Sequence, residues 1–223
     1  MKNIILAGNA ITADILNAYL AQDPRYRVVA LTVDDEYADQ GGIDGLETVP
    51  LSKLAERYSA TECAVIMAVG YNGLNRHRES LFNRLKALGY PIETYIHPDA
   101  KIYTEHPIGE GSVVLGNAVL EVHVKLGANS LVWCNATLAH HSAVGDHCWI
   151  ASGAVLSGQV MVRNNVFVGV NATIVNKVEV GEFSIIGGGA LITKSVKPSS
   201  VHLSRSAEEL RFSAEDYDKH FGI

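Results

Sequence analysis

The chain has 223 residues, enough for one large domain or two small ones, and 48% of them are hydrophobic, which can supply buried cores. The formal net charge is -6 without a block of Lys and Arg, which argues against a nucleic-acid or anionic-membrane surface, because both need clustered positive charge. Three cysteines without C-x-x-C spacing predict neither a disulfide framework nor a zinc finger, and they fit a reducing cytoplasm.

The N-terminal segment MKNIILAGNA has a short apolar run. It lacks the longer apolar region and small-residue cleavage site of a secretion signal, so we interpret it as a first strand. No stretch of the sequence approaches the length of a membrane span, and none is expected.

Strand-like and helix-like segments alternate before Ile96. The strands read KNIILAG, YRVVALTVDD and CAVIMAVG, and the helices read TADILNAYLA, SKLAERY and LNRHRESLFNRLKALG. This alternation predicts a small Rossmann-like parallel α/β domain over residues 1–95. Ligands of such sheets gather at the carboxyl ends of the strands. The candidate substrate or nucleotide contacts there are Gly8, Asn9, Asp34, Asp35, Gly70, Tyr71 and Asn72.

The acidic pair Asp34-Asp35 can accept hydrogen bonds from a ribose or a base. No G-x-G-x-x-G motif follows the first strand, so a dinucleotide site is not expected. For any single residue in these loops, an ordinary strand-end turn remains the alternative.

A six-residue repeat begins at Ile96. Every sixth residue from Ile96 to Ile192 is aliphatic, and the residue four after each of these anchors is small or Val, with His106 as the departure. Because side chains alternate along a strand, both positions point to the same side, so each hexapeptide is a short strand plus a turn. Glycine directly follows several anchors, where we expect a turn with φ values that favour glycine: Gly109, Gly127, Gly145, Gly169, Gly181 and Gly187.

This pattern resembles the left-handed β-helix of the hexapeptide acyltransferases, in which three hexapeptides, about 18 residues, form one coil. We assign residues 96–197 to this β-helix. The final stretch, SRSAEELRFSAEDYDKHFGI, has helical spacing. Since solenoids need terminal caps, residues 198–223 are expected to form a C-terminal helical cap over the open end or alongside it.

The segment LAHHSAVGDHCW places His140 and His141 at a corner of the β-helix. Histidine is the obvious general base near neutral pH, although a solvated turn residue is the plain alternative. Residues one coil apart share a corner, so Gly158 falls next to His140, while Glu105, His123, His141 and Gln159 form the adjacent column. A backbone N–H beside a base suits the oxyanion of an acyl-transfer intermediate.

The short α/β domain, the linker YIHPDA, and the segments TLAHHSAVG, FVGVNATI and IIGGGA together resemble the bacterial sugar acetyltransferases of the PglD and NeuD type. The resemblance covers nearly the whole chain. It implies a homotrimer that uses acetyl-CoA as acyl donor, with coenzyme A in the cleft between neighbouring β-helices and a nucleotide-linked amino sugar in the front domain. It further implies His140 as the catalytic base, Gly158 as the thioester-binding amide, and cofactor contacts at Gly187, Gly188 and Gly189.

Three features depart from that family. His141 stands where relatives commonly have an acidic residue that orients the catalytic imidazole, so the orienting partner is unassigned, with Glu105 or Glu121 as candidates. The first turn reads AGNAITAD instead of a Gly-rich turn with a histidine. The end SVKPSSVHLSRSAEEL lacks the usual small-residue and proline closing motif.

The leading hypothesis is an acetyl-CoA-dependent N-acetyltransferase of a nucleotide-linked amino sugar, in surface polysaccharide or glycan precursor biosynthesis. A sugar or sialic acid O-acetyltransferase is the close alternative; the nucleotide, the sugar and the small acyl group stay open. A γ-type carbonic anhydrase is disfavoured, because no third ligand joins His123 and His141, and no metal is expected. A non-catalytic scaffold is the remaining alternative. The aromatic residues Trp133, Trp149 and Phe167 are expected to fill a subunit interface.

Overall fold

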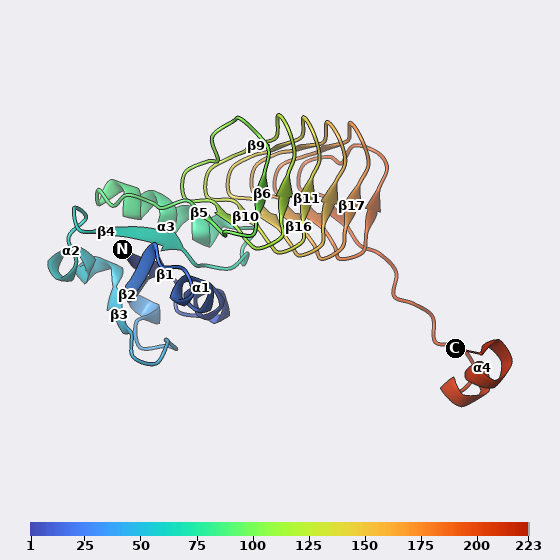
Figure 1. The fold of residues 1–223 in the computed structure, drawn as a ribbon, viewed down its shortest axis with the longest axis horizontal. Helices are drawn as coiled ribbons and strands as arrows, with labels where there is room; N and C mark the ends of the chain where they lie inside the picture. The colour runs from blue at the N-terminus through green and yellow to red at the C-terminus, as the bar shows by residue number, and fades with distance from the viewer. Residues whose placement is uncertain (223) are drawn as a thin grey trace.

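The computed structural model describes residues 1–222, and it divides into a front α/β region, a coiled β-helix and a C-terminal tail (Figure 1). The front region contains a four-stranded parallel sheet in the order β3-β2-β1-β4. Its strands are β1 (Lys2–Ala7), β2 (Tyr26–Val33), β3 (Glu47–Pro50) and β4 (Cys63–Met67). Its helices are α1 (Ile11–Ala21), α2 (Leu54–Arg57) and α3 (Arg76–Ala87), with the 3₁₀ turns η1 (Asp35–Tyr37) and η2 (Leu51–Lys53).

The two faces of strand β1 pack against different partners. Ile4 and Leu6 belong to a core that includes α1 and the first coils of the β-helix. Ile5 and Ala7 belong to a second core that includes α3. Strand β1 contributes to both cores because side chains alternate along a strand. The core shared with the first coils joins the sheet to the β-helix through a continuous apolar contact.

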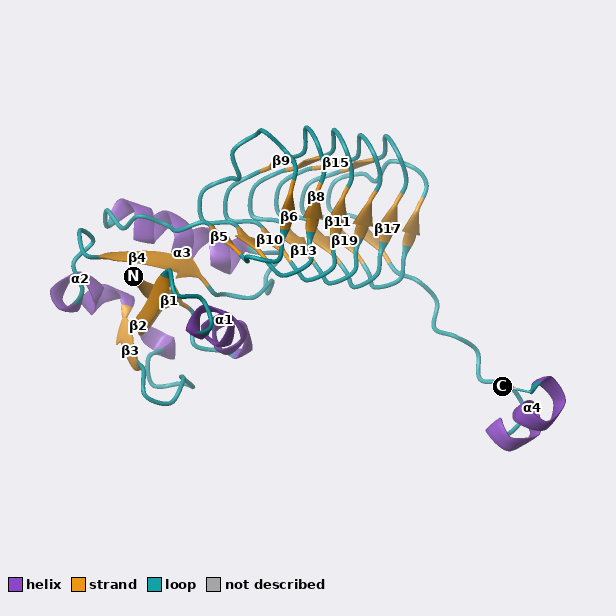
Figure 2. Ribbon diagram, viewed as in Figure 1, coloured by secondary structure: helices purple, strands orange, loops and turns teal. Residues whose placement is uncertain are grey.

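The β-helix consists of two-residue strands stacked into three parallel sheets (Figure 2). The first sheet contains β5 (Tyr95–Ile96), β7 (Val113–Val114), β10 (Leu131–Val132), β13 (Trp149–Ile150), β16 (Phe167–Val168), β19 (Ile185–Ile186) and β21 (Val201–His202). The second contains β6 (Lys101–Ile102), β8 (Val119–Leu120), β11 (Thr137–Leu138), β14 (Val155–Leu156), β17 (Thr173–Ile174) and β20 (Leu191–Ile192). The third contains β9 (Lys125–Leu126), β12 (Ala143–Val144), β15 (Met161–Val162) and β18 (Glu179–Val180).

The aliphatic anchors form the core of the β-helix, as the six-residue period predicts. Leu138 pairs in register with Leu156 of the next coil, and both are fully buried. The residues just before them, Thr137 and Val155, face outward. The coils therefore repeat every 18 residues, and paired strands in neighbouring coils lie about 4.8 Å apart.

Turn geometry corrects one expectation from the sequence. Positive φ recurs three residues after every anchor from Ile108 to Ile186, where Asn is the commonest residue and His141 has φ 60°. Asn and His are among the residues that tolerate this conformation best. The glycines directly after the anchors do not have positive φ. They are required by close stacking instead, because a Cβ on Gly127 would lie 2.5 Å from the carbonyl carbon of Gly145.

The C-terminal tail leaves the β-helix after β21, which pairs with β19, and ends in helix α4 (Ala214–Phe221). Ser213 caps this helix by accepting the N–H of Asp216. Figure 1 shows α4 at the end of an extended segment, away from the coils, and Phe221 at its end is 66% exposed. The capping role expected for residues 198–223 therefore stays a prediction. No helix within residues 1–222 is long and apolar enough to cross a membrane.

Candidate active site

The imidazole of His140 lies directly over the backbone of Gly158. A Cβ built on Gly158 would come within 2.5 Å of His140 Cε1 and 2.6 Å of His140 Nε2. Because Gly158 does not have positive φ, its backbone would accept an alanine, and only the imidazole excludes one. The juxtaposition predicted from the 18-residue spacing is present in the structure.

The N–H of Gly158 is available beside that imidazole. The backbone N–H groups on either side of it are already hydrogen-bonded. The N–H of Gln159 donates to the carbonyl of His140 at 3.0 Å, and the N–H of Ser157 donates to the carbonyl of Ile174. Among the described residues, the Gly158 N–H has no acceptor. A donor free of protein partners next to a base is what a developing oxyanion requires.

Two candidates for orienting His140 have other partners. Glu121 accepts the backbone N–H of His140 at 2.7 Å through Oε2, so it fixes the turn rather than the ring. Glu105 contacts Nδ1 of His123 at 2.6 Å. The ring of His140 instead meets His141, with the two Nδ1 atoms 3.2 Å apart.

His141 also contacts a histidine of the preceding coil, His123. The rings of His123 and His141, one coil apart, have centroids 4.6 Å from each other. Beside them is a cavity of about 440 Å³ lined also by His106, Lys125 and Met161. Glu105, His123, His141 and Gln159 were predicted from the sequence to form a column. His106, Lys125 and Met161 were not assigned to a site, although they lie within two positions of that column in the register.

Most of the predicted front-domain residues meet in one hollow of about 280 Å³ at the carboxyl ends of β1, β2 and β4. Of the predicted contacts, Gly8, Asn9, Asp34, Gly70 and Asn72 line it. Gly8 has φ 137°, and a Cβ there would lie 2.6 Å from the carbonyl oxygen of Ala68, so these strand ends approach closely. The sequence reasoning missed Tyr37 and His77, which also line the hollow.

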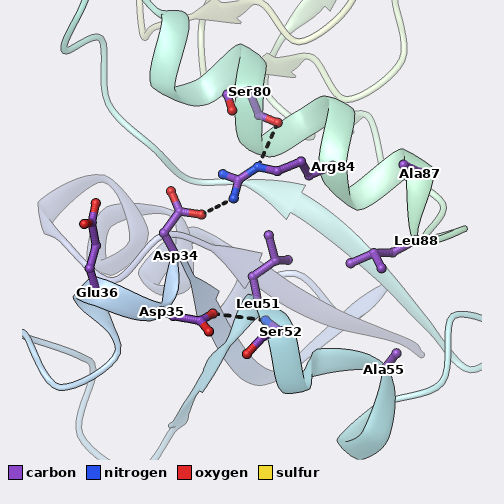
Figure 3. A pocket seen from close by; sticks show the side chains of 10 residues that line it. All are labelled: Asp34, Asp35, Glu36, Leu51, Ser52, Ala55, Ser80, Arg84, Ala87 and Leu88. Atoms are coloured by element: carbon purple, nitrogen blue, oxygen red, sulfur yellow. Dashed lines mark hydrogen bonds and ion pairs between the residues drawn. The ribbon is translucent and has the colours of Figure 1, made fainter.

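Asp34 lies between this hollow and a larger one of about 960 Å³, shown in Figure 3. Its carboxylate forms an ion pair with Arg84 of α3 at 2.6 Å. Asp35 lines the larger hollow only, where Oδ1 accepts the N–H of Ser52 at 3.1 Å. Hydrogen bonding from the Ser52 side chain, and then from this N–H, lowers the pKa of the Asp35 carboxyl. The two neighbouring carboxylates therefore have different surroundings.

Tyr71 lies against the β-helix instead of the hollow. Its ring contacts Trp149 and Phe167, with centroid distances of 5.1 and 4.7 Å. Trp133 lies 5.3 Å from Trp149 in the same cluster. These aromatic residues therefore pack against the chain's own front region instead of the subunit interface expected of them, because the first sheet of the β-helix faces that region.

The predicted cofactor glycines lie at a different corner of the β-helix from His140. Gly187 underlies the tail, since a Cβ there would meet Leu203 at 2.7 Å, and Ser204 donates to the carbonyl of Gly188 at 2.6 Å. The outer face of the second sheet joins this corner to Gly158. Along it Val155, Thr173 and Leu191 stand side by side, and Leu191 is 63% exposed.

Within residues 1–222, no group of three or more His, Cys, Asp or Glu side chains is placed to hold a metal ion. The three cysteines are free, and Cys63 and Cys148 are buried. Burial raises the pKa of the Cys148 thiol to about 12. Because the thiolate is the reactive form of cysteine, burial and a raised pKa disfavour Cys148 as a nucleophile.

No protein-family model and no curated protein matches the chain by sequence. Among solved structures, the acetyltransferase domain of PglB from Neisseria gonorrhoeae FA1090 is 25% identical, with a TM-score of 0.80 over 94% of this chain and 100% of that one. The same domain is also known in complex with acetyl coenzyme A.

Two further structures have the same overall form. PerB from Caulobacter crescentus, in complex with CoA and GDP-perosamine, is 22% identical, with a TM-score of 0.78 over 92% of this chain and 94% of that one. WeeI from Acinetobacter baumannii AYE is 21% identical, with a TM-score of 0.78 over 92% and 97%. The chain has the fold of the hexapeptide-repeat sugar acetyltransferases. The expected α/β region followed by a left-handed β-helix and a C-terminal helix is thereby confirmed.

Proposed function

We propose that the protein is an acetyl-CoA-dependent N-acetyltransferase that acts on the amino group of a nucleotide-linked amino sugar, in surface polysaccharide or glycan precursor biosynthesis. The observation that carries this proposal is the imidazole of His140 lying over Gly158, whose N–H has no acceptor among the described residues. The shared fold with an acetyltransferase domain that binds acetyl coenzyme A supports the same chemistry.

In the proposed reaction, Nε2 of His140 takes a proton from the sugar amine as the amine nitrogen attacks the thioester carbonyl carbon. The N–H of Gly158 stabilises the negative charge that forms on the carbonyl oxygen. The carbon–sulfur bond then breaks, the amide forms, and the proton held by His140 passes to the departing thiolate. A positioned base of this kind contributes about 100- to 10,000-fold.

The outer face of the second sheet provides a path for coenzyme A. With the thioester at Gly158, the pantetheine arm runs over the outward-facing side chains of Val155, Thr173 and Leu191 toward Gly187–Gly189. Val155 and Leu191 are exposed apolar side chains on this face, so a flexible aliphatic arm can displace water from them. The ordered contact between Ser204 and Gly188 places the tail beside the far end of this path.

The nucleotide sugar binds in the front region. The hollow of Gly8, Asn9, Gly70 and Asn72 lies at the carboxyl edge of the parallel sheet, which is the usual ligand edge of such sheets. Asp34 lines both front hollows and can accept a hydrogen bond from a base or ribose that spans them. Tyr37 and His77 are further contacts on the same wall.

The active form is a cytoplasmic homotrimer. The exposed aliphatic side chains of Val122 and Val170 on the β-helix leave apolar area that neighbouring copies would bury. Free thiols at all three cysteines fit a reducing compartment. Sedimentation equilibrium tests the assembly, with about three times the chain mass of 24.0 kDa expected.

The test is a substrate panel assayed with acetyl-CoA. UDP-, GDP- and dTDP-linked amino sugars are offered beside their hydroxyl counterparts and free sialic acids, and thiol release and product mass are followed. We expect one nucleotide-linked amino sugar to gain an acetyl group on nitrogen. Acetylation confined to hydroxyl groups or to free sialic acids contradicts the proposal, and so does a failure of every amino sugar in the panel.

A further inference from the structure

The catalytic base proposed above has no carboxylate on its imidazole. Glu121 binds the backbone N–H of His140, and Glu105 lies one coil further away with its carboxylate on His123. Nδ1 of His141 is 3.2 Å from Nδ1 of His140, and their rings are nearly perpendicular, at 84°. The orienting contact in this chain is therefore made by a second imidazole.

We propose that Glu105, His123 and His141 form a relay that positions His140 for catalysis in place of a single adjacent carboxylate. This inference rests on the proposed function, because it concerns how the base of that reaction is held. His141 and His123 are positioning residues, since neither lies against Gly158.

Tautomers fix the direction of the contact. Two Nδ1 atoms at 3.2 Å form a hydrogen bond only if one carries the proton. For His140 to act as a base through Nε2, its Nδ1 must carry the hydrogen and donate it to an unprotonated Nδ1 of His141. A protonated His141 cannot accept, so the relay works only while His141 is neutral.

The β-helix register explains why the relay can form. His123 and His141 occupy the same turn position in successive coils, with φ values of 62° and 60°, so their rings are in contact, with centroids 4.6 Å apart and planes tilted by 54°. Glu105, one coil before His123, accepts Nδ1–H of His123 at 2.6 Å. This bond lowers the pKa of the Glu105 carboxyl to about 2, so it stays ionised at neutral pH. Glu105 thus holds His123, and His123 supports His141.

Charged groups face this relay from several coils. Lys125 and His106 line the cavity beside His123 and His141, and Oε1 of Glu105 is 3.5 Å from Nε2 of His106. Glu121 lies at the turn below His140. A carboxylate in place of His141 would add a negative charge in direct contact with the base, which favours its protonated form. The acidic limb of the pH–rate profile would then move to higher pH.

The experiment compares His141→Asn, His123→Asn and His141→Glu in the intact protein. Asn fits this turn, since Asn135 and Asn171 occupy the same position in other coils with positive φ. For His141→Asn we expect kcat to fall by about 100-fold, within the range of general-base contributions, with KM for acetyl-CoA changed by less than about twofold. For His123→Asn we expect a fall of about fivefold, because it acts through His141.

His141→Glu should recover kcat to within about fivefold of the wild type and move the acidic limb to higher pH, since charge-assisted hydrogen bonds are roughly twice as strong as neutral ones. Lys177→Asn is the matched control, because Lys177 has the same turn conformation two coils beyond His141. It should leave kcat unchanged, and thermal unfolding of every variant checks folding.

Wild-type kcat in a folded His141→Asn variant overturns the relay. Loss of activity in His141→Glu equal to that in His141→Asn overturns it as well. These failures are distinct from failure of the proposed function, which would appear as an active His140→Ala variant.

Discussion

The β-helix and the front region build their sites in different ways. In the β-helix, every coil repeats the previous one after 18 residues, so His140 meets Gly158 through the same register that pairs Leu138 with Leu156. In the front region, the hollow around Asp34 forms from loops after three strands and the first turn of α3, with no repeated spacing. In a periodic scaffold, the register alone determines which residues meet in the site. In an α/β sheet, the topology determines only the edge of the sheet at which a ligand binds.

The core of the β-helix gives the largest predicted effect. Leu156→Ala removes a fully buried anchor and should lower the free energy of unfolding by about 2–5 kcal/mol. Each coil contacts its neighbours, so hydrogen exchange should rise in β11, β14 and β17 but not in β1 or β4. Val155→Ala, which alters the adjacent outward side chain, is the control and should change stability by less than about 1 kcal/mol. A uniform rise in exchange over both regions would contradict the distinction between them.

Asp34 tests the front region. Asp34→Asn should raise KM for the nucleotide sugar by about tenfold, because it removes a charged acceptor at the junction of the two hollows. KM for acetyl-CoA should not change, since His140 and Gly158 belong to the other region. Glu62→Gln, at the opposite end of β4, serves as the control. A change in both KM values would mean that the two regions do not separate the substrates as proposed.

A smaller effect is expected where the two regions meet. Arg25 binds Asp23 at 2.6 Å and donates to the carbonyl of Ile96, at the start of the first coil. The hydrogen bond from Arg25 lowers the pKa of Asp23, so this contribution is present above about pH 4 and is lost as the pH falls further. Asp23→Asn should cost about 1 kcal/mol at pH 7 and less near pH 3, as urea unfolding would measure. An equal cost at both pH values would exclude this ion pair as the cause.

The sequence was informative where the structure is periodic. The aliphatic anchors, the coil length and the contact of His140 with Gly158 all follow from one spacing, and these features are present in the structure. Positive φ is expected from the sequence at the glycines directly after the anchors, but these glycines are required by the close stacking of neighbouring coils and not by backbone conformation.

Other features depend on side-chain directions that spacing does not determine. Asp34 and Asp35 are adjacent, yet only Asp34 lines both hollows. Tyr71 follows a strand end, as predicted, but its ring packs on Trp149 because the first sheet of the β-helix faces that loop. The contact between His140 and His141 similarly depends on the orientation of the two rings at a turn. The positions of these histidines follow from the sequence, but the directions of their rings do not.

The central claim, that His140 and Gly158 form one acyl-transfer site, is tested most directly by Gly158→Ala alone and combined with His140→Ala. The added methyl group occupies the space of the imidazole, so kcat should fall by about 100-fold in Gly158→Ala, and the same change should have little further effect when His140 is already Ala. Wild-type kcat in a folded Gly158→Ala variant, or losses from the two changes that simply multiply, would contradict the claim.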